Sequence, residues 1–215
     1  MDTYIYGNTF FSKKVAAIFS VDFPNQFKGY IVDKEFMNEE DDNIIAWEDF
    51  CERPHSTNFE ILVTIGYTHM NEGRKKVFEK IKKYNYRIGT YISSSALVSP
   101  GVQIGEGCII LQRCLIEPNC IIGNGNILDG NATIAHNTTI NHFNWFGMGS
   151  VVLGDINIGS NCFFGANSTI RDNLVIGDET LVGAGAYINN NTESGQVIVP
   201  ARSVVLNKTS REIKI

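Results

Sequence analysis

The chain has 215 residues, of which 43% are hydrophobic and 19% are charged, and its formal net charge at neutral pH is -5. This composition fits a globular chain with one large or two small domains, and the acidic balance argues against nucleic-acid binding, which needs a basic surface. No apolar run approaches the roughly 18 residues of a membrane span. The start, MDTYIYGN, lacks the basic region of a signal peptide, and five cysteines without such a signal favour the reduced cytoplasm. We therefore expect a cytoplasmic protein.

The first ninety residues alternate between strand and helix patterns. Strands are predicted over residues 3–7, 29–33 and 59–66, and helices over residues 8–20, capped by Asn8 or Thr9, and about residues 73–85. A last strand over residues 86–93 leads into the second half. The alternation predicts a small parallel sheet covered by helices, a truncated Rossmann-like α/β domain. We place this domain at residues 1–90 and a second domain at residues 91–215.

The turn after the first strand is where a Rossmann-type domain binds phosphate, through the pattern G-x-G-x-x-G. Here the turn reads YGNTFFSKK, so Gly7 alone survives from that pattern, and Phe10 and Phe11 stand in the way. This weakens, without excluding, a phosphate site at the start of the following helix. Asp33 ends the second strand, where an acid often contacts a ribose or base, but it suits a turn after a strand equally well.

From residue 98 onward the chain repeats with a period of six. All 16 register positions across 91 residues are apolar, without a slip: Val98, Ile104, Ile110, Ile116, Ile122, Leu128, Ile134, Ile140, Phe146, Val152, Ile158, Phe164, Ile170, Ile176, Val182 and Ile188. Neither a helix nor a single strand has this period. A hexapeptide period is typical of a parallel β-helix, in which each coil has three short strands and about 18 residues. We predict the left-handed form, an exception to right-handed crossovers.

Two further register positions agree with this architecture. The residue two places before the apolar position is mostly small, and Cys108, Cys114 and Cys120 occupy it on successive faces of the coil. They are therefore interpreted as buried small side chains rather than metal ligands. The residue after the apolar position is glycine at seven places, where we expect the corner to need an unhindered backbone.

Charge is distributed unevenly along the chain. Residues 1–90 hold 26 Asp, Glu, Lys and Arg, whereas residues 98–188 hold only 9. Sparse charge on a prism with three flat faces suggests that its sides are covered, and symmetric self-association is the economical explanation. A polar surface rich in Asn, Thr and Ser is the alternative.

The α/β domain joined to a left-handed β-helix resembles one bacterial group, from YIYG through GYIVD and VTIG to VPARSV. This group is the hexapeptide-repeat sugar acetyltransferases, which include sialic acid O-acetyltransferases and nucleotide 4-amino-sugar N-acetyltransferases. The resemblance implies that the N-terminal domain holds a sugar nucleotide, that the β-helix forms a homotrimer, and that acetyl-CoA lies between subunits. It implies an acetyl-CoA-dependent N-acetyltransferase in surface polysaccharide or glycan precursor biosynthesis, with sugar O-acetylation as the alternative.

The resemblance assigns the catalytic base to His136, in TIAHNTTI. The family commonly has an acid beside this histidine, where the present chain has Ala135 and Asn137. One coil later lies Gly154, which should leave room beside the imidazole for a ligand. Asp129, seven residues earlier, is a candidate to orient the ring or bind the sugar, or is a solvated corner residue.

The remaining candidates also follow from the resemblance. Trp145 stands where some members have a second histidine that contacts the thioester. The acetyl-CoA arm is expected along small residues above His136, and the nucleotide part of the acceptor along the α/β domain. The acetyl-CoA set is Trp145, Gly154, Ala166, Gly183 and Ala184; the acceptor set is Gly7, Asn8, Thr9, Asp33 and Gly66.

Three other interpretations compete with this assignment. His142 stacks between Asn124 and Ser160, an ordinary polar column, so it is not our candidate base. A zinc carbonic anhydrase on a β-helix needs three histidine ligands, whereas the repeats contain only His136 and His142. A non-catalytic sugar-binding β-helix is the third alternative, because a fold does not fix a function. We expect no metal cofactor.

Overall fold

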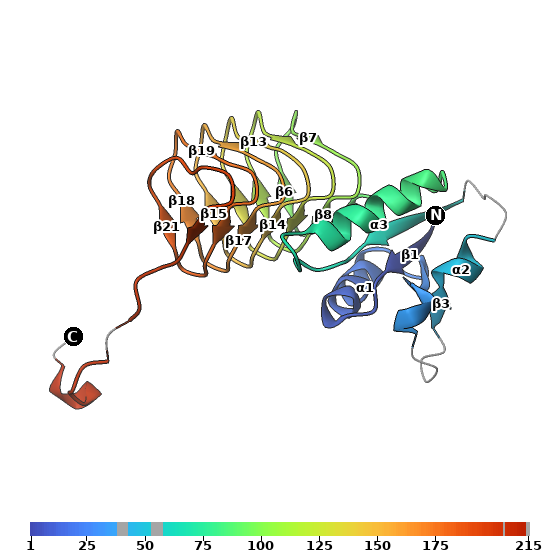
Figure 1. The fold of residues 1–215 in the computed structure, drawn as a ribbon, viewed down its shortest axis with the longest axis horizontal. Coiled ribbons are helices and arrows are strands. Elements are labelled where there is room, and N and C mark those ends of the chain that lie inside the picture. Colours follow the sequence, from blue (N-terminus) through green and yellow to red (C-terminus); the bar gives the residue numbers. More distant parts are fainter. Residues whose placement is uncertain (38–42, 53–57, 204, 214–215) are drawn as a thin grey trace.

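The computed structural model describes residues 1–37, 43–52, 58–203 and 205–213. Figure 1 shows an α/β unit at one end, a long prism of stacked coils, and a C-terminal segment that leads away from the prism. No helix among the described residues is long and apolar enough to cross a lipid bilayer.

The α/β unit is built on a four-stranded parallel sheet with the order β3-β2-β1-β4. Its elements are β1 (Asp2–Tyr6), α1 (Phe10–Asp22), β2 (Phe27–Val32), η1 (Lys34–Phe36), β3 (Ile44–Ala46), α2 (Trp47–Phe50), β4 (Phe59–Val63) and α3 (Glu72–Lys83). The three predicted strands and two predicted helices are present, and Thr9 is the N-cap of α1. The sequence patterns missed β3 and α2, which are only three and four residues long.

The prism confirms the predicted left-handed parallel β-helix. Each of its strands has two residues, and the strands stack into three parallel sheets. The first sheet has β7 (Gln103–Ile104), β10 (Ile121–Ile122), β13 (Thr139–Ile140), β16 (Asn157–Ile158) and β19 (Val175–Ile176). The second has β5 (Tyr91–Ile92), β8 (Ile109–Ile110), β11 (Ile127–Leu128), β14 (Trp145–Phe146), β17 (Phe163–Phe164), β20 (Leu181–Val182) and β22 (Val197–Ile198). The third has β6 (Leu97–Val98), β9 (Leu115–Ile116), β12 (Thr133–Ile134), β15 (Val151–Val152), β18 (Thr169–Ile170) and β21 (Tyr187–Ile188). A last short helix, η2 (Ser210–Glu212), lies in the C-terminal segment.

The period-six apolar side chains fill the prism, where they form one buried cluster with Cys108, Cys114, Cys120 and Cys162. Burial raises the pKa of Cys108 and Cys114 to about 11 and that of Cys162 to about 12. These thiols are therefore protonated at neutral pH and pack as small side chains.

The glycines of the repeats have a role that differs from the predicted one. The corner backbone has its positive φ three residues after the apolar position, mostly at Asn or Gly, for example at Asn119 and Gly125. The glycines directly after the apolar position lack a positive φ. They are needed because the next coil lies against them: a Cβ at Gly105 would lie 2.4 Å from the side chain of Asn124. Close stacking, rather than backbone conformation, requires them.

The two halves share a buried interface. Ile5, Val15 and Leu62 of the α/β unit pack with Ile109 and Ile127 on the outer face of the second sheet. The predicted strand over residues 86–93 is split, because Ile88 bridges to Ile61 of the small sheet whereas Tyr91 already belongs to the β-helix. The chain therefore passes from the α/β unit to the β-helix between residues 88 and 91.

Arg74 of α3 ties the halves together as a fully buried cation. Its guanidinium donates to the carbonyl oxygens of Gly125, Phe143 and Asn144 on the β-helix, at 2.9, 3.0 and 3.1 Å. Burial lowers its pKa to about 9, so it remains charged at neutral pH. Asn71, at the N-terminus of α3, adds a hydrogen bond to the carbonyl of Cys162. These contacts fix the α/β unit on one face of the prism.

Candidate functional site

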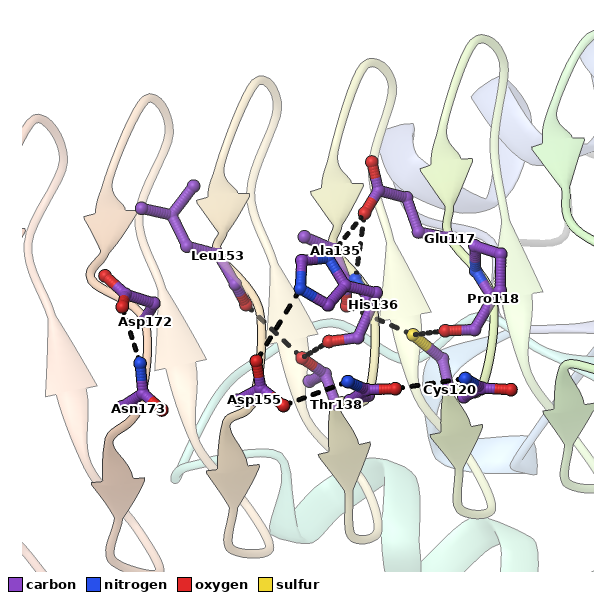
Figure 2. Close-up of polar contacts among 12 residues, drawn as sticks. Glu117, Pro118, Cys120, Ala135, His136, Thr138, Leu153, Asp155, Asp172 and Asn173 are labelled. Atoms are coloured by element: carbon purple, nitrogen blue, oxygen red, sulfur yellow. Dashed lines mark hydrogen bonds and ion pairs between the residues drawn. The ribbon is translucent and has the colours of Figure 1, made fainter.

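His136 lies at the corner where the chain leaves the third sheet after β12 and turns toward the first. Its side chain is 54% exposed, and Figure 2 shows it between residues of the preceding and following coils. The backbone N–H of His136 donates to Glu117 Oε2 at 2.9 Å, and ring Nδ1 lies 3.1 Å from the same oxygen. On its other side, ring Nε2 lies 3.6 Å from Asp155 Oδ2. The imidazole is thus held between two carboxylates.

Glu117 acts as the orienting acid that the sequence next to His136 lacks. The backbone N–H of His136 and then its ring lower the pKa of Glu117, so the carboxylate is ionised at neutral pH. An ionised carboxylate can only accept a hydrogen bond, which places the proton of a neutral imidazole on Nδ1. Nε2 is then the nitrogen with the lone pair, as a general base requires. Glu117 was not among the predicted site residues, because it lies 19 residues away from His136, on the preceding coil.

Gly154 stacks on His136, as the 18-residue coil predicts. A Cβ at Gly154 would lie 2.6 Å from His136 Nε2 and 2.7 Å from Cε1. The imidazole itself therefore occupies the room that the glycine leaves, which corrects the expectation that this room is kept for a ligand. Gly154 is needed to let the ring lie flat against the next coil.

Asp129 does not orient the ring, in contrast to one of its two predicted roles. It lies after β11 at a different corner of the prism, where its Oδ1 is 2.5 Å from Lys14 Nζ and accepts from the backbone N–H of Gly130 at 2.7 Å. It therefore joins α1 to the prism. The partner of Asp129 is thus set by the packing of α1 on the prism, because Lys14 lies 115 residues earlier in the sequence.

His142 lies at the third corner, after β13. Its Nδ1 accepts from the backbone N–H of Asn124 at 2.9 Å, and its own backbone N–H donates to Ser160 Oγ at 3.3 Å. The polar column predicted for this histidine is therefore present. Within the described residues, no three His, Cys, Asp or Glu side chains converge as metal ligands would.

The predicted acetyl-CoA residues separate into three places. Trp145 is only 6% exposed and packs against Phe11 and Tyr67, with ring centroids 4.8 and 5.0 Å away. It belongs to the interface with the α/β unit, and its contact with the thioester stays a prediction. The second sheet carries that unit, which buries the outward side chains of Ile109, Ile127 and Trp145.

The small residues of the acetyl-CoA set lie at two corners of the same chain. Gly154 is beside His136, whereas Ala166, Gly183 and Ala184 lie between the second and third sheets, after β17 and β20. These three therefore do not stack above His136 within one chain, because the third sheet separates the two corners. The sequence register alone did not distinguish one corner from the other.

The predicted acceptor residues gather around a cavity of about 440 Å³ in the α/β unit. Gly7, Asn8, Thr9 and Asp33 line it, together with Tyr6, Val32, Phe36, Ile65, Gly73, Lys76 and Val77. Gly66 is absent from the lining, and its carbonyl accepts from Arg74 instead. Phe10 and Phe11, which were expected to stand in the way of a phosphate at this turn, do not line the cavity. Phe11 packs on Trp145, and Phe10 is 87% exposed. The cavity lies where parallel strands end, the usual ligand position in such sheets.

Asp33 is held in this cavity by two neighbours. Its carboxylate accepts from the hydroxyl of Tyr6 at 2.5 Å and forms an ion pair with Lys80. Burial, followed by the bond to Asp33, raises the pKa of Tyr6, so Tyr6 remains a donor. Lys80 in turn lies 5.0 Å from the ring centre of Trp47. Gly7 has φ 118°, and a Cβ there would lie 2.8 Å from Ser12 Oγ, so this turn needs glycine.

Comparison with known proteins supports the repeat architecture at the sequence level. The profile of the bacterial transferase hexapeptide, a unit of six repeats, matches residues 137–172 and 155–190. No curated protein sequence matches the chain.

Solved structures are similar to both halves of the chain together. A single-residue variant of perosamine N-acetyltransferase from Caulobacter crescentus, in complex with CoA and GDP-perosamine, has a TM-score of 0.83 at 19% identity, covering 93% of this chain and 94% of that one. The acetyltransferase domain of PglB from Neisseria gonorrhoeae, in complex with acetyl coenzyme A, has a TM-score of 0.83 at 19% identity, covering 93% and 96%. WeeI from Acinetobacter baumannii has a TM-score of 0.55 at 18% identity, covering 93% and 97%. These similarities confirm the two-part fold.

Proposed function

We propose that the protein transfers the acetyl group of acetyl-CoA to the amine of a nucleotide-linked amino sugar, with His136 as the general base. The observation that carries this proposal is the His136 ring, whose Nδ1 is bound by Glu117 and whose Nε2 lies at an exposed corner. A positioned imidazole with an available Nε2 suits proton removal from an attacking amine or hydroxyl at neutral pH. Two proteins of similar fold are acetyltransferases in complex with CoA or acetyl-CoA, which supports the same chemistry here.

The transfer is a direct one. The acceptor nitrogen attacks the thioester carbonyl, and Nε2 of His136 takes the proton from the nitrogen as the C–N bond forms. We assign the backbone N–H of Gly154, on the coil that faces the ring, to the developing oxyanion. The carbonyl then re-forms, the C–S bond breaks, and the imidazolium returns the proton to the leaving thiolate. No covalent enzyme intermediate is needed.

We assign the nucleotide part of the acceptor to the cavity beside Gly7, Asn8, Thr9 and Asp33. Its apolar walls suit a flat base, and Lys76 at its edge supplies a positive charge for a phosphate. The similar perosamine N-acetyltransferase holds GDP-perosamine, a sugar nucleotide of this class. We therefore also propose that the reaction belongs to cytoplasmic glycan precursor biosynthesis.

We also propose a homotrimer with active sites between subunits. The α/β unit covers the second sheet from Tyr91 to Trp145. The first and third sheets carry exposed apolar side chains outside this contact: Leu97 at 69%, Tyr187 at 57%, Val175 at 52% and Ile121 at 46%. These exposed apolar side chains, together with the nine charged residues among residues 98–188, support self-association through the two sheets. His136 lies at the corner between these two sheets, so a neighbouring prism would form the other wall of its cleft. Acetyl-CoA is assigned to that cleft.

The test of the proposed function is thiol release from acetyl-CoA in the presence of GDP- and UDP-linked amino sugars. His136→Ala should lower kcat by about 10²–10⁴-fold, the usual effect of removing a general base. Acetyl-CoA binding should change little, because small residues and backbone hold the thioester arm. His142→Ala is the matched control, and it should lose less than about tenfold.

Four outcomes would contradict the proposal. Near-normal kcat in His136→Ala, or a large loss in His142→Ala, would refute the assigned base. Absence of thiol release with every amino sugar would favour the non-catalytic sugar-binding alternative. Faster acetylation of a sugar hydroxyl than of an amine would favour O-acetylation.

A further inference from the structure

The carboxylate in front of His136 Nε2 belongs to Asp155, on the following coil. Its Oδ1 accepts a hydrogen bond from Asn137 Nδ2 at 3.0 Å, and its Oδ2 faces Nε2 at 3.6 Å. The side chain of Asp155 is 47% exposed. Figure 2 shows Glu117 and Asp155 on opposite sides of the imidazole. Glu117 therefore contacts the Nδ1 side of the ring, whereas Asp155 lies beside Nε2, the nitrogen that takes the proton in the proposed reaction.

The backbone at this corner does not require an aspartate. Asn119, Asn137, Asp155 and Asn173 occupy the same place in successive coils, all with φ between 56° and 62°. Asn and Asp both tolerate this left-handed conformation. Asn119 donates to Asn137, which donates to Asp155, and an Asn at position 155 would accept that bond equally well through its own Oδ1. What Asp155 adds is a negative charge, placed beside the catalytic nitrogen.

A negative charge at this point suits a positively charged acceptor. An aliphatic amine has a pKa of about 8 or above and is mostly protonated at neutral pH, whereas a sugar hydroxyl carries no charge. An ammonium bound to a carboxylate forms a charge-assisted hydrogen bond, about twice as strong as the neutral bond that a hydroxyl offers. We propose that Asp155 binds the acceptor ammonium beside His136 and makes the site selective for an amine over a hydroxyl. This inference rests on the proposed function and decides between its N- and O-acetylation forms.

The proton balance is compatible with this role. The acceptor R–NH3⁺, held by Asp155 Oδ2, releases one proton to water before the attack. The lone pair of R–NH2 then forms the C–N bond, the C=O π pair moves to the oxygen, and His136 Nε2 takes the second proton. When the C–S bond breaks, the thiolate takes that proton from the imidazolium. The products are the N-acetyl sugar and CoA thiol, with one proton released overall.

The test compares Asp155→Asn with Asp172→Asn. Asp172 is the matched control, because it lies at the same corner one coil further on and bonds to Asn173 rather than to the imidazole. The probes are GDP- and UDP-linked 4-amino-4,6-dideoxyhexoses and their 4-hydroxy counterparts. For the amine that the wild type acetylates, we measure kcat and KM, and for the matching hydroxyl compound we measure its Ki as a competitor.

Asp155→Asn should raise the KM for the amine about tenfold, which corresponds to about 1.4 kcal/mol. The Ki for the hydroxyl compound should change less than about twofold, and Asp172→Asn should change neither constant. A structural role for Asp155 would raise the KM and the Ki together, and that result, or an unchanged KM, would overturn the inference. A wild type that acetylates the hydroxyl compound as readily as the amine would also overturn it while leaving acetyl transfer intact. Absence of any thiol release by the wild type would instead refute the proposed function.

Discussion

The contact between Gly154 and the imidazole predicts that a single methyl group will reduce activity without unfolding the protein. In Gly154→Ala, the new Cβ would lie 2.6 Å from His136 Nε2, whereas ordinary contact begins at 3.4 Å. The ring must therefore move by about 0.8 Å or leave its place against the coil. Either movement disturbs its contacts with Glu117 and Asp155.

The expected magnitude follows from this displacement. A misplacement of about 1 Å in a catalytic group costs about 10²-fold in rate, so kcat of Gly154→Ala should fall by about that factor. Stability should be retained, because Gly154 does not have a positive φ and the exposed ring is able to rotate away. Replacement of glycine by alanine at a compatible backbone is in fact stabilising by about 0.4–1 kcal/mol.

The assay is thiol release at saturating substrates, together with a thermal melt of each variant. Gly130→Ala is the matched control, since the nearest atom to its Cβ, the carbonyl oxygen of Gln112, would lie at an ordinary 3.5 Å. This control should keep normal kcat. A kcat of Gly154→Ala within about threefold of wild type would refute the predicted displacement of the ring. An equal loss of activity and of folded protein would refute it as well.

Two further predictions concern the acceptor cavity and the assembly. Lys76→Ala should raise the KM for the acceptor about three- to tenfold, because a phosphate contact is lost. Lys83→Ala, on the same helix but outside the cavity lining, should leave this KM unchanged. Equal effects of both substitutions would argue against the cavity as the nucleotide site. Sedimentation at micromolar concentration should give close to three times the chain mass of 23.9 kDa, because the exposed apolar side chains of the first and third sheets favour association. A monomer under these conditions would remove the basis for a cleft between subunits.

The sequence alone determined the features that depend on repetition. A period of six puts each apolar residue inside the prism and each coil 18 residues after the last, so the stacking of Gly154 on His136 followed from counting. The pairing of His142 with Asn124 and Ser160 followed in the same way. In the first half, alternating strand and helix patterns were sufficient to predict the parallel sheet. They were not sufficient for β3 and α2, which are too short to show a period.

Tertiary structure decided the contacts that no period encodes. The direction of the imidazole selects Glu117 and Asp155, one residue off the stacking register on either side, and excludes Asp129. The docking of the α/β unit buries Trp145, pairs Asp129 with Lys14, and brings Arg74 to carbonyl groups of the β-helix. Such contacts join residues far apart in the chain, and they depend on which sheet the α/β unit covers. Coil stacking is local and repeated, so the sequence displays it; docking happens once, between surfaces whose fit exists only after both halves have folded.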